Sequence, residues 1–263
     1  MDYDVNLSIL FTELPLLDRP AAARAAGFEA AEFWWPFDVA VPPDAEVDRF
    51  VRAVEDAGLR LALLNFYGGD LAAGERGLIS TPGREGELAD NVDVAVGIAE
   101  RLGCRTFNPL YGLRIDGLDP SAQDEHALST LDTMAAKVAR IGGRLALEPL
   151  SAVPRYPLLT SADALRVLDA LGRDDVLLLA DLYHLAVNGD DLDEVVALDR
   201  IGHVQIADAP GRHQPGTGSL DIPGYLRKLS AAGYAGYVGV EYHPIGHSAD
   251  SFGWMGAASW TRS

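Results

Sequence analysis

The sequence predicts a single closed (β/α)8 barrel over residues 1–263. Three observations support this fold. Eight short apolar runs alternate with eight helix-like segments, which is the order of elements in such a barrel. Acidic or amide residues stand at the ends of the later apolar runs, where barrels of this kind place their sites. The length also suits one barrel, because (β/α)8 domains are typically of about 250 residues.

The strand candidates are nearly continuous apolar runs, as expected for parallel strands that are buried on both faces. They are Val5–Leu10, Ala30–Trp34, Arg60–Asn65, Thr106–Pro109, Arg144–Glu148, Val176–Asp181, Ile201–Ile206 and Tyr237–Glu241. We expect the barrel over about residues 4–243 and a tail with a short closing helix over 244–263. A doubly wound open sheet would carry a glycine-rich phosphate turn after its first strand, and Ser8–Thr12 contains no glycine.

Start and stop signals delimit the helices between these strands. The expected starts are Asp18–Pro20, Pro43–Asp44, Thr160–Ser161 and Asp221–Pro223, and the expected ends are Gly27, Gly58, Gly103 and Gly142. The sixth helix is interrupted by Asn188–Asp191. The long, glycine-rich connection over Tyr67–Pro82 is expected to form an ordered loop over the barrel mouth.

The charge balance restricts the partners of this chain. A formal net charge of −18 disfavours nucleic acid and anionic membranes, which bind proteins through lysine and arginine. A small anionic substrate remains compatible if a few arginines gather in the pocket. The N-terminus lacks the features of a signal peptide, and no apolar run is long enough to span a bilayer. We therefore expect a cytoplasmic protein, and the sequence leaves homo-oligomer formation open.

Four polar residues at successive strand ends predict a divalent-cation site. Glu148, Asp181, Gln205 and Glu241 are spaced by about 24 to 36 residues, close to the length of one βα unit. In a barrel their side chains would converge at the mouth, and an oxygen-rich set suits Mg2+ or Mn2+ better than Zn2+. Taken singly, Asp181 could instead cap a helix, and Gln205 could be a buried core amide.

Glu148 and Glu241 would face each other across the mouth, because two strands separate theirs. One carboxylate could take a proton from carbon while the other returns a proton to the neighbouring carbon, as aldose–ketose isomerisation through an enediolate requires. A cation would polarise the carbonyl and stabilise the enediolate oxygens. The pair therefore predicts an isomerase with two glutamates as proton donors and acceptors.

Several residues are candidates for binding a substrate. His184 could hold a hydroxyl or a carboxylate, or could be packed beneath a loop. Arg76 and Arg212 could bind a carboxylate through two hydrogen bonds, and Asn65 ends the third strand candidate. Glu32 is a further pocket candidate, while the place of His203 favours barrel packing or support of the site. The aromatic segment 33–37 could shield the pocket or pack helices on the barrel.

Several segments resemble hydroxypyruvate isomerases of the xylose-isomerase-like TIM barrel superfamily. The more specific ones are Ala73–Gly77, in the mouth loop, and Gln205–Asp208. The others are Gly69–Ala72, Pro82–Glu85, Glu148–Pro149, Asp181–His184, Gly202–Val204, Pro215–Gly218 and Gly239–Tyr242. Together they run in order along nearly the whole chain.

The resemblance implies interconversion of hydroxypyruvate and tartronate semialdehyde, a reaction of glyoxylate and carbohydrate metabolism. It assigns the proton transfers to Glu148 and Glu241, and the metal to these two with Asp181 and Gln205. Epimerases of the superfamily generally carry histidine at the position of Gln205, so this difference fits the isomerase branch and lowers the expected metal affinity. Segment 151–156 and Leu71 also differ from the family pattern, which bears on the choice of substrate.

Other functions stay open beside the leading one. A 2-oxo-tetronate isomerase is the nearest alternative, and a ketose 3-epimerase is disfavoured by Gln205 and the arginines. A DNA-repair endonuclease of the same architecture would need a histidine-rich zinc cluster and a basic surface. A silent binding protein for sugar acids would bind its ligand without exchanging protons with solvent.

Overall fold

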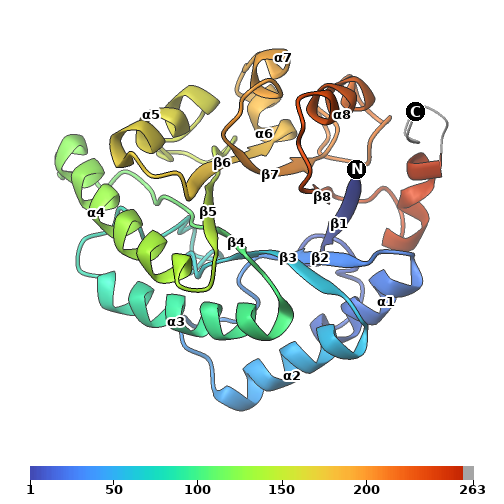
Figure 1. The fold of residues 1–263 in the computed structure, drawn as a ribbon, viewed down its shortest axis with the longest axis horizontal. Coiled ribbons are helices and arrows are strands. Elements are labelled where there is room, and N and C mark those ends of the chain that lie inside the picture. Colours follow the sequence, from blue (N-terminus) through green and yellow to red (C-terminus); the bar gives the residue numbers. More distant parts are fainter. Residues whose placement is uncertain (257–263) are drawn as a thin grey trace.

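A computed structural model describes residues 1–256, in which eight parallel strands close into one barrel in sequence order (Figure 1). The strands are β1 (Asp2–Asn6), β2 (Ala30–Phe33), β3 (Arg60–Asn65), β4 (Thr106–Asn108), β5 (Arg144–Leu147), β6 (Val176–Asp181), β7 (Ile201–Ile206) and β8 (Tyr237–Val240). β1 completes the barrel by pairing with β8, with Val5 beside Val240. The predicted (β/α)8 barrel is confirmed, and the open doubly wound sheet is excluded.

Helices surround the barrel on its outer side (Figure 1). They are α1 (Arg19–Ala25), α2 (Asp44–Asp56), α3 (Glu85–Leu102), α4 (Pro120–Ala139), α5 (Ser161–Leu171), α6 (Leu182–Val187), α7 (Leu192–Val195) and α8 (Ile222–Ala231), with 3-10 helices η1 (Leu16–Asp18) and η2 (Ser248–Gly256). Residues predicted to start or stop helices do so at several helix termini. Thr160 and Asp163 form a capping box at the start of α5, and Gly103, in a left-handed conformation, ends α3. Among helices within residues 1–256, none combines the length and apolar character needed to cross a bilayer.

The first strand lies earlier in the chain than the predicted Val5–Leu10. β1 begins at Asp2 and ends at Asn6, where the chain turns. The Asn6 side-chain oxygen accepts a hydrogen bond from the backbone N–H of Ser8 (2.9 Å), and its backbone carbonyl accepts one from Leu10 (3.0 Å). The apolar character of this turn reflects burial, since Leu10 is fully buried without being in a strand. The prediction was wrong because apolarity reports burial more directly than strand conformation.

The ends of the other strands agree closely with the prediction. Arg60–Asn65, Val176–Asp181 and Ile201–Ile206 match as predicted. The remaining four strands end one residue before the predicted end, so Trp34, Pro109, Glu148 and Glu241 follow their strands directly. This difference places the two glutamates just beyond the strand ends, where their side chains are not confined to the sheet's alternation.

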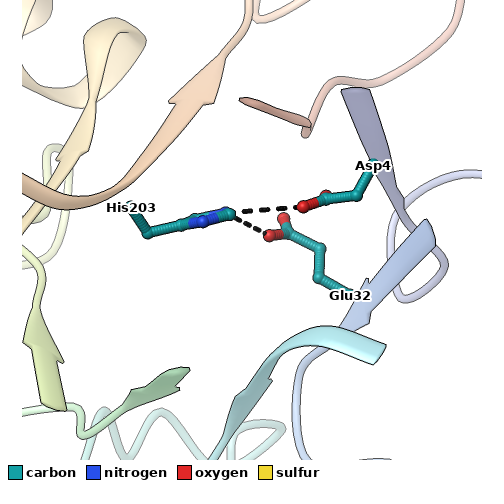
Figure 2. Close-up of side chains that lie close together, drawn as sticks. All are labelled: Asp4, Glu32 and His203. Atoms are coloured by element: carbon teal, nitrogen blue, oxygen red, sulfur yellow. Dashed lines mark hydrogen bonds and ion pairs between the residues drawn. The ribbon is translucent and has the colours of Figure 1, made fainter. Parts of the chain in front are cut away.

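The barrel interior is apolar on one side and polar on another. Leu63, Ala146 and Leu179 form a small fully buried cluster. Asp4, Glu32 and His203 come from β1, β2 and β7 and point toward one another (Figure 2). Burial of ionisable groups costs free energy even when they are paired, so this cluster indicates a role other than stabilising the fold.

The loop between β3 and α3 is joined to the connection that follows β4, because the N–H of Gly112 donates to the carbonyl of Arg76 (3.0 Å). The Gly77 N–H donates to the carbonyl of Gly68 (2.8 Å), and its φ of 109° is unfavourable for other residues. A Cβ added to Gly77 would lie 2.0 Å from the carbonyl oxygen of Leu110. The sequence expectation of an ordered loop over the mouth is met by this attachment.

We expect Gly77→Ala to lower the free energy of unfolding by about 2 kcal/mol, because backbone strain of this kind costs on the order of 1–3 kcal/mol and the clash is with backbone. Urea titration followed by fluorescence measures the loss. Gly74→Ala is the matched control, since Gly74 has a φ of 98° in the same loop but nothing within 4 Å of an added Cβ. Equal losses in the two variants would show that the contact with Leu110 is unimportant.

Candidate active site

Each of the eight strands brings one polar side chain to the carboxyl end of the barrel. Asn6, Glu32, Asn65, Asn108, Asp181 and Gln205 lie near or at the ends of β1, β2, β3, β4, β6 and β7, and Glu148 and Glu241 directly follow β5 and β8. All eight are buried, with at most 4% of their surface exposed. The carboxyl end of the barrel is therefore a polar layer, as expected where such barrels carry their active sites.

A cavity of about 250 Å³ opens above this layer. Its polar lining residues are Asn65, Arg76, Glu148, Ser151, His184, Arg212 and Glu241, and its apolar lining includes Trp34, Trp35, Phe66, Leu71, Leu110, Leu150 and Val153. Trp34 and Trp35 shield the cavity, whereas Phe33 packs on Phe50 of α2 with ring centroids 4.9 Å apart. The aromatic segment thus both lines the pocket and packs a helix on the barrel, as predicted. Asp181 and Gln205 lie below the cavity rather than in its lining.

Glu148 is held by an amide that the sequence analysis did not single out. Asn108 donates a hydrogen bond from Nδ2 to Glu148 Oε2 (2.6 Å). Burial raises the pKa of Glu148 to about 8, with a further increase from the charge of Asp181, while the bond from Asn108 lowers it. A carboxyl group with a pKa near neutrality can both take up and release a proton at physiological pH.

Glu241 accepts hydrogen bonds on both carboxylate oxygens. Its Oε1 accepts from Arg212 (2.5 Å), and its Oε2 accepts from Asn6 (2.8 Å) and Gln205 (2.5 Å). Burial raises the pKa of Glu241 well above its usual range, Arg212 lowers it, and the charge of Glu148 raises it again. The two predicted proton-transfer residues therefore face one cavity and influence each other's ionisation.

Asp181 and Gln205 each have a buried oxygen with no hydrogen-bond partner among the described residues. They are Asp181 Oδ2 and Gln205 Oε1, and the two residues lie side by side in the register of β6 and β7. Asp181 also caps α6, because Oδ1 accepts from the N–H of Tyr183 (2.8 Å). Asp181 therefore caps the helix with Oδ1, as the alternative interpretation predicted, while Oδ2 is still able to bind a ligand.

These residues fit a divalent cation. The two unpartnered oxygens and the carboxylate of Glu148 are oxygen ligands of the kind that Mg2+ and Mn2+ prefer, whereas both oxygens of Glu241 already accept hydrogen bonds. Glu148, Asp181 and His184 each also offer one atom within 4.8 Å of the others. This group could hold a metal, and it differs from the predicted set in containing His184 and neither Gln205 nor Glu241.

The ring of His184 is oriented by a hydrogen bond from the backbone. Its Nδ1 accepts from the backbone N–H of Ser151 (3.0 Å), so the neutral ring carries its proton on Nε2. Burial lowers the pKa of His184 to about 4, which keeps the ring neutral. The Nε2 atom lies 3.6 Å from Asp181 Oδ2, and the side chain lines the cavity.

Arg212 is placed among the acidic residues at the base of the cavity. Its guanidinium contacts Glu241, lies 3.7 Å from Asp181 Oδ2 and sits 5.5 Å from the ring centroid of Tyr183. Its backbone is left-handed, with a φ of 53°, an uncommon conformation that tends to occur at functional sites. Burial lowers the pKa of Arg212, but Glu241 and Asp181 outweigh this effect and raise it.

The other two predicted binding residues also line the cavity. Asn65 has a buried Oδ1 without a hydrogen-bond partner among residues 1–256, so it can accept a hydrogen bond from a ligand. Arg76 donates from Nη1 to the carbonyls of Leu71 and Glu75, which anchors the guanidinium in the mouth loop. Six of the nine residues named as site candidates from the sequence therefore line the cavity, whereas Asp181, Gln205 and Glu32 do not.

Three residues of the site were missed by the sequence analysis. Asn108 lies near the end of the fourth predicted strand, so the reasoning that found Glu148 and Glu241 could have found it, whereas Asn6 was missed because the first strand was predicted too late in the chain. Ser151 contacts His184 only because the chain folds back, and no sequence signal indicates this contact. A second hollow of about 440 Å³, lined by Arg144 and Tyr234, involves the opposite ends of the strands and none of these residues.

Comparison with known proteins places the chain among relatives of the same length. Residues 20–262 match the family model for the xylose isomerase-like TIM barrel. The chain is 49% identical to a candidate hydroxypyruvate isomerase from Streptomyces coelicolor, over 98% of this chain and 96% of that protein. It is 33% identical to the 2-oxo-tetronate isomerase of Pectobacterium atrosepticum, over 96% and 95% of the two chains. A crystal structure from Brucella melitensis, named as an AP endonuclease of family 2, is similar with a TM-score of 0.89, 35% identity and 97% coverage of both chains.

Proposed function

The chain belongs to the xylose isomerase-like TIM barrel family, and on this premise we propose that it interconverts hydroxypyruvate and tartronate semialdehyde through an enediolate. Relatives at 49% and 33% identity over nearly the whole chain are named as isomerases, so the protein is an isomerase. The observation that supports the specific reaction is the pair formed by Glu148 and Glu241. Both are buried, both line one cavity, and both have raised pKa values.

In this proposal the two glutamates divide the proton transfers between neighbouring carbons. One carboxylate removes a proton from C3 of hydroxypyruvate, and the electron pair of that C–H bond forms the enediolate. The other, in its protonated form, delivers a proton to C2, while the hydroxyl proton moves from O3 to O2. Atoms and charge balance, because one C–H bond breaks and one forms. Raised pKa values suit both roles, since acid and base must exchange protons near neutral pH.

The remaining residues bind and orient the substrate. His184 donates from Nε2 to a substrate oxygen, and Asn65 accepts from a substrate hydroxyl through Oδ1. Arg212 and Arg76 provide the positive charge that a 2-oxo acid needs in so acidic a chain. Glu148, Asp181, Gln205 and Glu241 would hold Mg2+ or Mn2+. Such a cation supplies charge stabilisation to the oxygens of the enediolate.

A 2-oxo-tetronate is the second candidate substrate. A relative named as a 2-oxo-tetronate isomerase covers 96% of the chain, and a cavity of about 250 Å³ leaves room for a fourth carbon. The apolar lining that includes Leu71, Leu150 and Val153 is where a longer chain would extend. Both substrates use the same pair of glutamates, so the choice between them does not alter the reaction class.

Cleavage of DNA at abasic sites is less well supported, although one similar structure is named as an AP endonuclease. The net charge of −18 opposes the approach of DNA. Within residues 1–256, each group of side chains spaced to hold a metal contains only one histidine. The charge balance and the single histidine in each of these groups therefore disfavour a nuclease.

Proton NMR of the pure protein with hydroxypyruvate in D2O tests the proposal. We expect tartronate semialdehyde to form with deuterium on the carbon that receives the proton. Parallel samples with Mg2+, Mn2+ or a chelator measure the dependence on metal, and a sample with a 2-oxo-tetronate compares substrates. Absence of both product and exchange with hydroxypyruvate would reject it as the substrate. Binding without exchange would favour a silent binding protein, and nicking of abasic duplex DNA would favour the endonuclease.

A further inference from the structure

Two amides connect Glu241 to a second carboxylate below it. Asn6 Nδ2 donates to Glu241 Oε2 (2.8 Å) and to Glu32 Oε1 (3.0 Å). Gln205 Nε2 donates to the same two oxygens, at 2.5 Å and 2.7 Å. Each NH2 group thus uses both hydrogens on a pair of carboxylates. Glu32 Oε1, Glu241 Oε2 and the two nitrogens form a closed ring of four hydrogen bonds.

This ring determines which way each amide faces. A carboxylate can only accept hydrogen bonds, so the nitrogen of Gln205 must point toward Glu32 and Glu241. Its oxygen then points away, and that oxygen is the one without a partner among the described residues. Without Glu32, each amide would keep only one of its two carboxylate acceptors, and rotation of the amide would no longer be opposed on both sides.

Glu32 is itself fixed from below. His203 Nε2 lies 2.7 Å from Glu32 Oε2, and Asp4 Oδ2 lies 3.8 Å from the same nitrogen (Figure 2). Burial, followed by the charge of Glu32, raises the pKa of Asp4 well above its usual range.

The backbone of β8 also leaves space for this carboxylate. A Cβ added to Gly239 would lie 2.8 Å from both oxygens of Glu32. Asp4, Glu32 and His203 each offer one atom within 4.8 Å of the others, close enough for a metal. Both oxygens of Glu32 are nevertheless engaged, one by the two amides and one by His203, which favours a role in hydrogen bonding.

We propose that Glu32 is a positioning residue that acts through Asn6 and Gln205 to hold the Glu241 carboxylate in its reactive orientation. The proposal rests on the proposed function in so far as Glu241 transfers a proton. Glu32 does not line the cavity, so it does not touch the substrate. Replacement of Glu32 should therefore change the turnover rate rather than the affinity for the substrate.

A graded pair of variants tests this role. Glu32→Gln retains an oxygen that can accept from the amides but removes the charge, and Glu32→Leu removes both. We expect Glu32→Leu to lower kcat by about 100-fold with KM changed by less than about threefold, because a misplacement of about 1 Å can cost that much in rate. Glu32→Gln should recover part of the loss, since a neutral acceptor forms weaker bonds than a carboxylate.

Leu168→Ala is the control for a general loss of stability. Leu168 is fully buried in α5 on the outer layer and does not line the cavity. Truncation of such a leucine costs about 2–5 kcal/mol without changing the polar layer. We expect this variant to melt at a lower temperature and to keep its kcat within about threefold of the parent.

Isotope exchange separates positioning from a structural effect. If Glu241 is displaced while Glu148 stays in place, exchange at one of the two carbons should continue as turnover falls. The ratio of deuterium exchange to product formation should therefore rise in Glu32→Leu. The rise should be seen with only one of the two starting compounds, hydroxypyruvate or tartronate semialdehyde, because only the carbon served by Glu148 continues to exchange. Leu168→Ala should leave this ratio unchanged.

A crystal structure of Glu32→Leu decides the matter without reference to activity. A turned Gln205 amide or a moved Glu241 carboxylate is the expected result. The same positions and contacts as in the parent would overturn the proposal, as would a kcat equal to that of Leu168→Ala. If the parent itself neither converts nor exchanges any 2-oxo acid, the proposed function fails, and the crystal structure still tests whether Glu32 positions Glu241.

Discussion

Replacement of Glu148 by glutamine is expected to lower the turnover of hydroxypyruvate by about 100-fold to 10,000-fold, the usual contribution of a general acid or base. The change is nearly isosteric, and the glutamine oxygen can still accept the hydrogen bond that Asn108 donates to Glu148 Oε2. It removes the ability to take a proton from carbon. Steady-state kinetics measures the loss, and Glu87→Gln, outside the cavity on α3, is the matched control.

Deuterium exchange gives this prediction a second readout. If Glu148 and Glu241 act at different carbons, Glu148→Gln and Glu241→Gln should each still exchange the carbon-bound proton of one compound with solvent, and the compound should differ between the two variants. One variant would exchange hydroxypyruvate and the other tartronate semialdehyde, while neither turns over at a useful rate. Identical exchange patterns in the two variants, or a turnover within about tenfold of the parent, would contradict the division of roles.

The same Glu148→Gln variant is expected to be more stable than the parent at pH 7 to 8. Burial and the charge of Asp181 raise the pKa of Glu148 from 4.5 to about 8. Between these values the unfolded chain gives up the proton and the folded chain keeps it. The parent therefore loses stability as pH rises, by about 1.4 kcal/mol for each pH unit at most. Below pH 4.5 both states hold the proton and the loss disappears.

Glutamine is neutral at every pH, so the variant escapes this loss. We expect an advantage on the order of 3 kcal/mol at pH 7, falling toward zero at pH 4.5. Urea unfolding over this range, with chelator present so that cation binding does not stabilise the parent, measures it. Glu87→Gln should show no such trend. A constant difference across pH, or a parent that is more stable at pH 8, would contradict the raised pKa.

Much of the fold was predictable because the relevant signals are local. Parallel strands covered on both faces read as apolar runs, and glycine, proline and capping residues mark the helix ends. The interruption at Asn188–Asp191 does divide the sixth helical segment into α6 and α7. The error at β1 arose because Asp2 and Asp4 conceal a strand, while the apolar residues after Asn6 form a buried turn.

The candidate site was predictable to the extent that strand ends define it. The four polar residues at the ends of the later strands, and the binding candidates Asn65, Arg76, His184 and Arg212, lie in or below one cavity. Asn108 follows the same rule and was overlooked, whereas Asn6 was hidden by the wrong bounds of the first predicted strand. The contact of Ser151 with His184, which sets the ring tautomer, joins residues that no spacing rule connects.

The sequence by itself determined the order of the strands and which acidic or amide group each strand end carries. The alternation of apolar runs with helical segments, and the glycine, proline and capping residues at their ends, are local properties of the chain. Only the tertiary structure decided how those groups interact. Closure of the barrel brings Asn6 against Glu241 from the far end of the chain and links Glu241 to Glu32 through that amide. It also excludes water from Glu148, which raises the pKa of that residue to about 8. Ionisation and amide orientation depend on burial and on approaches of a few ångströms, and both arise only when the last strand meets the first.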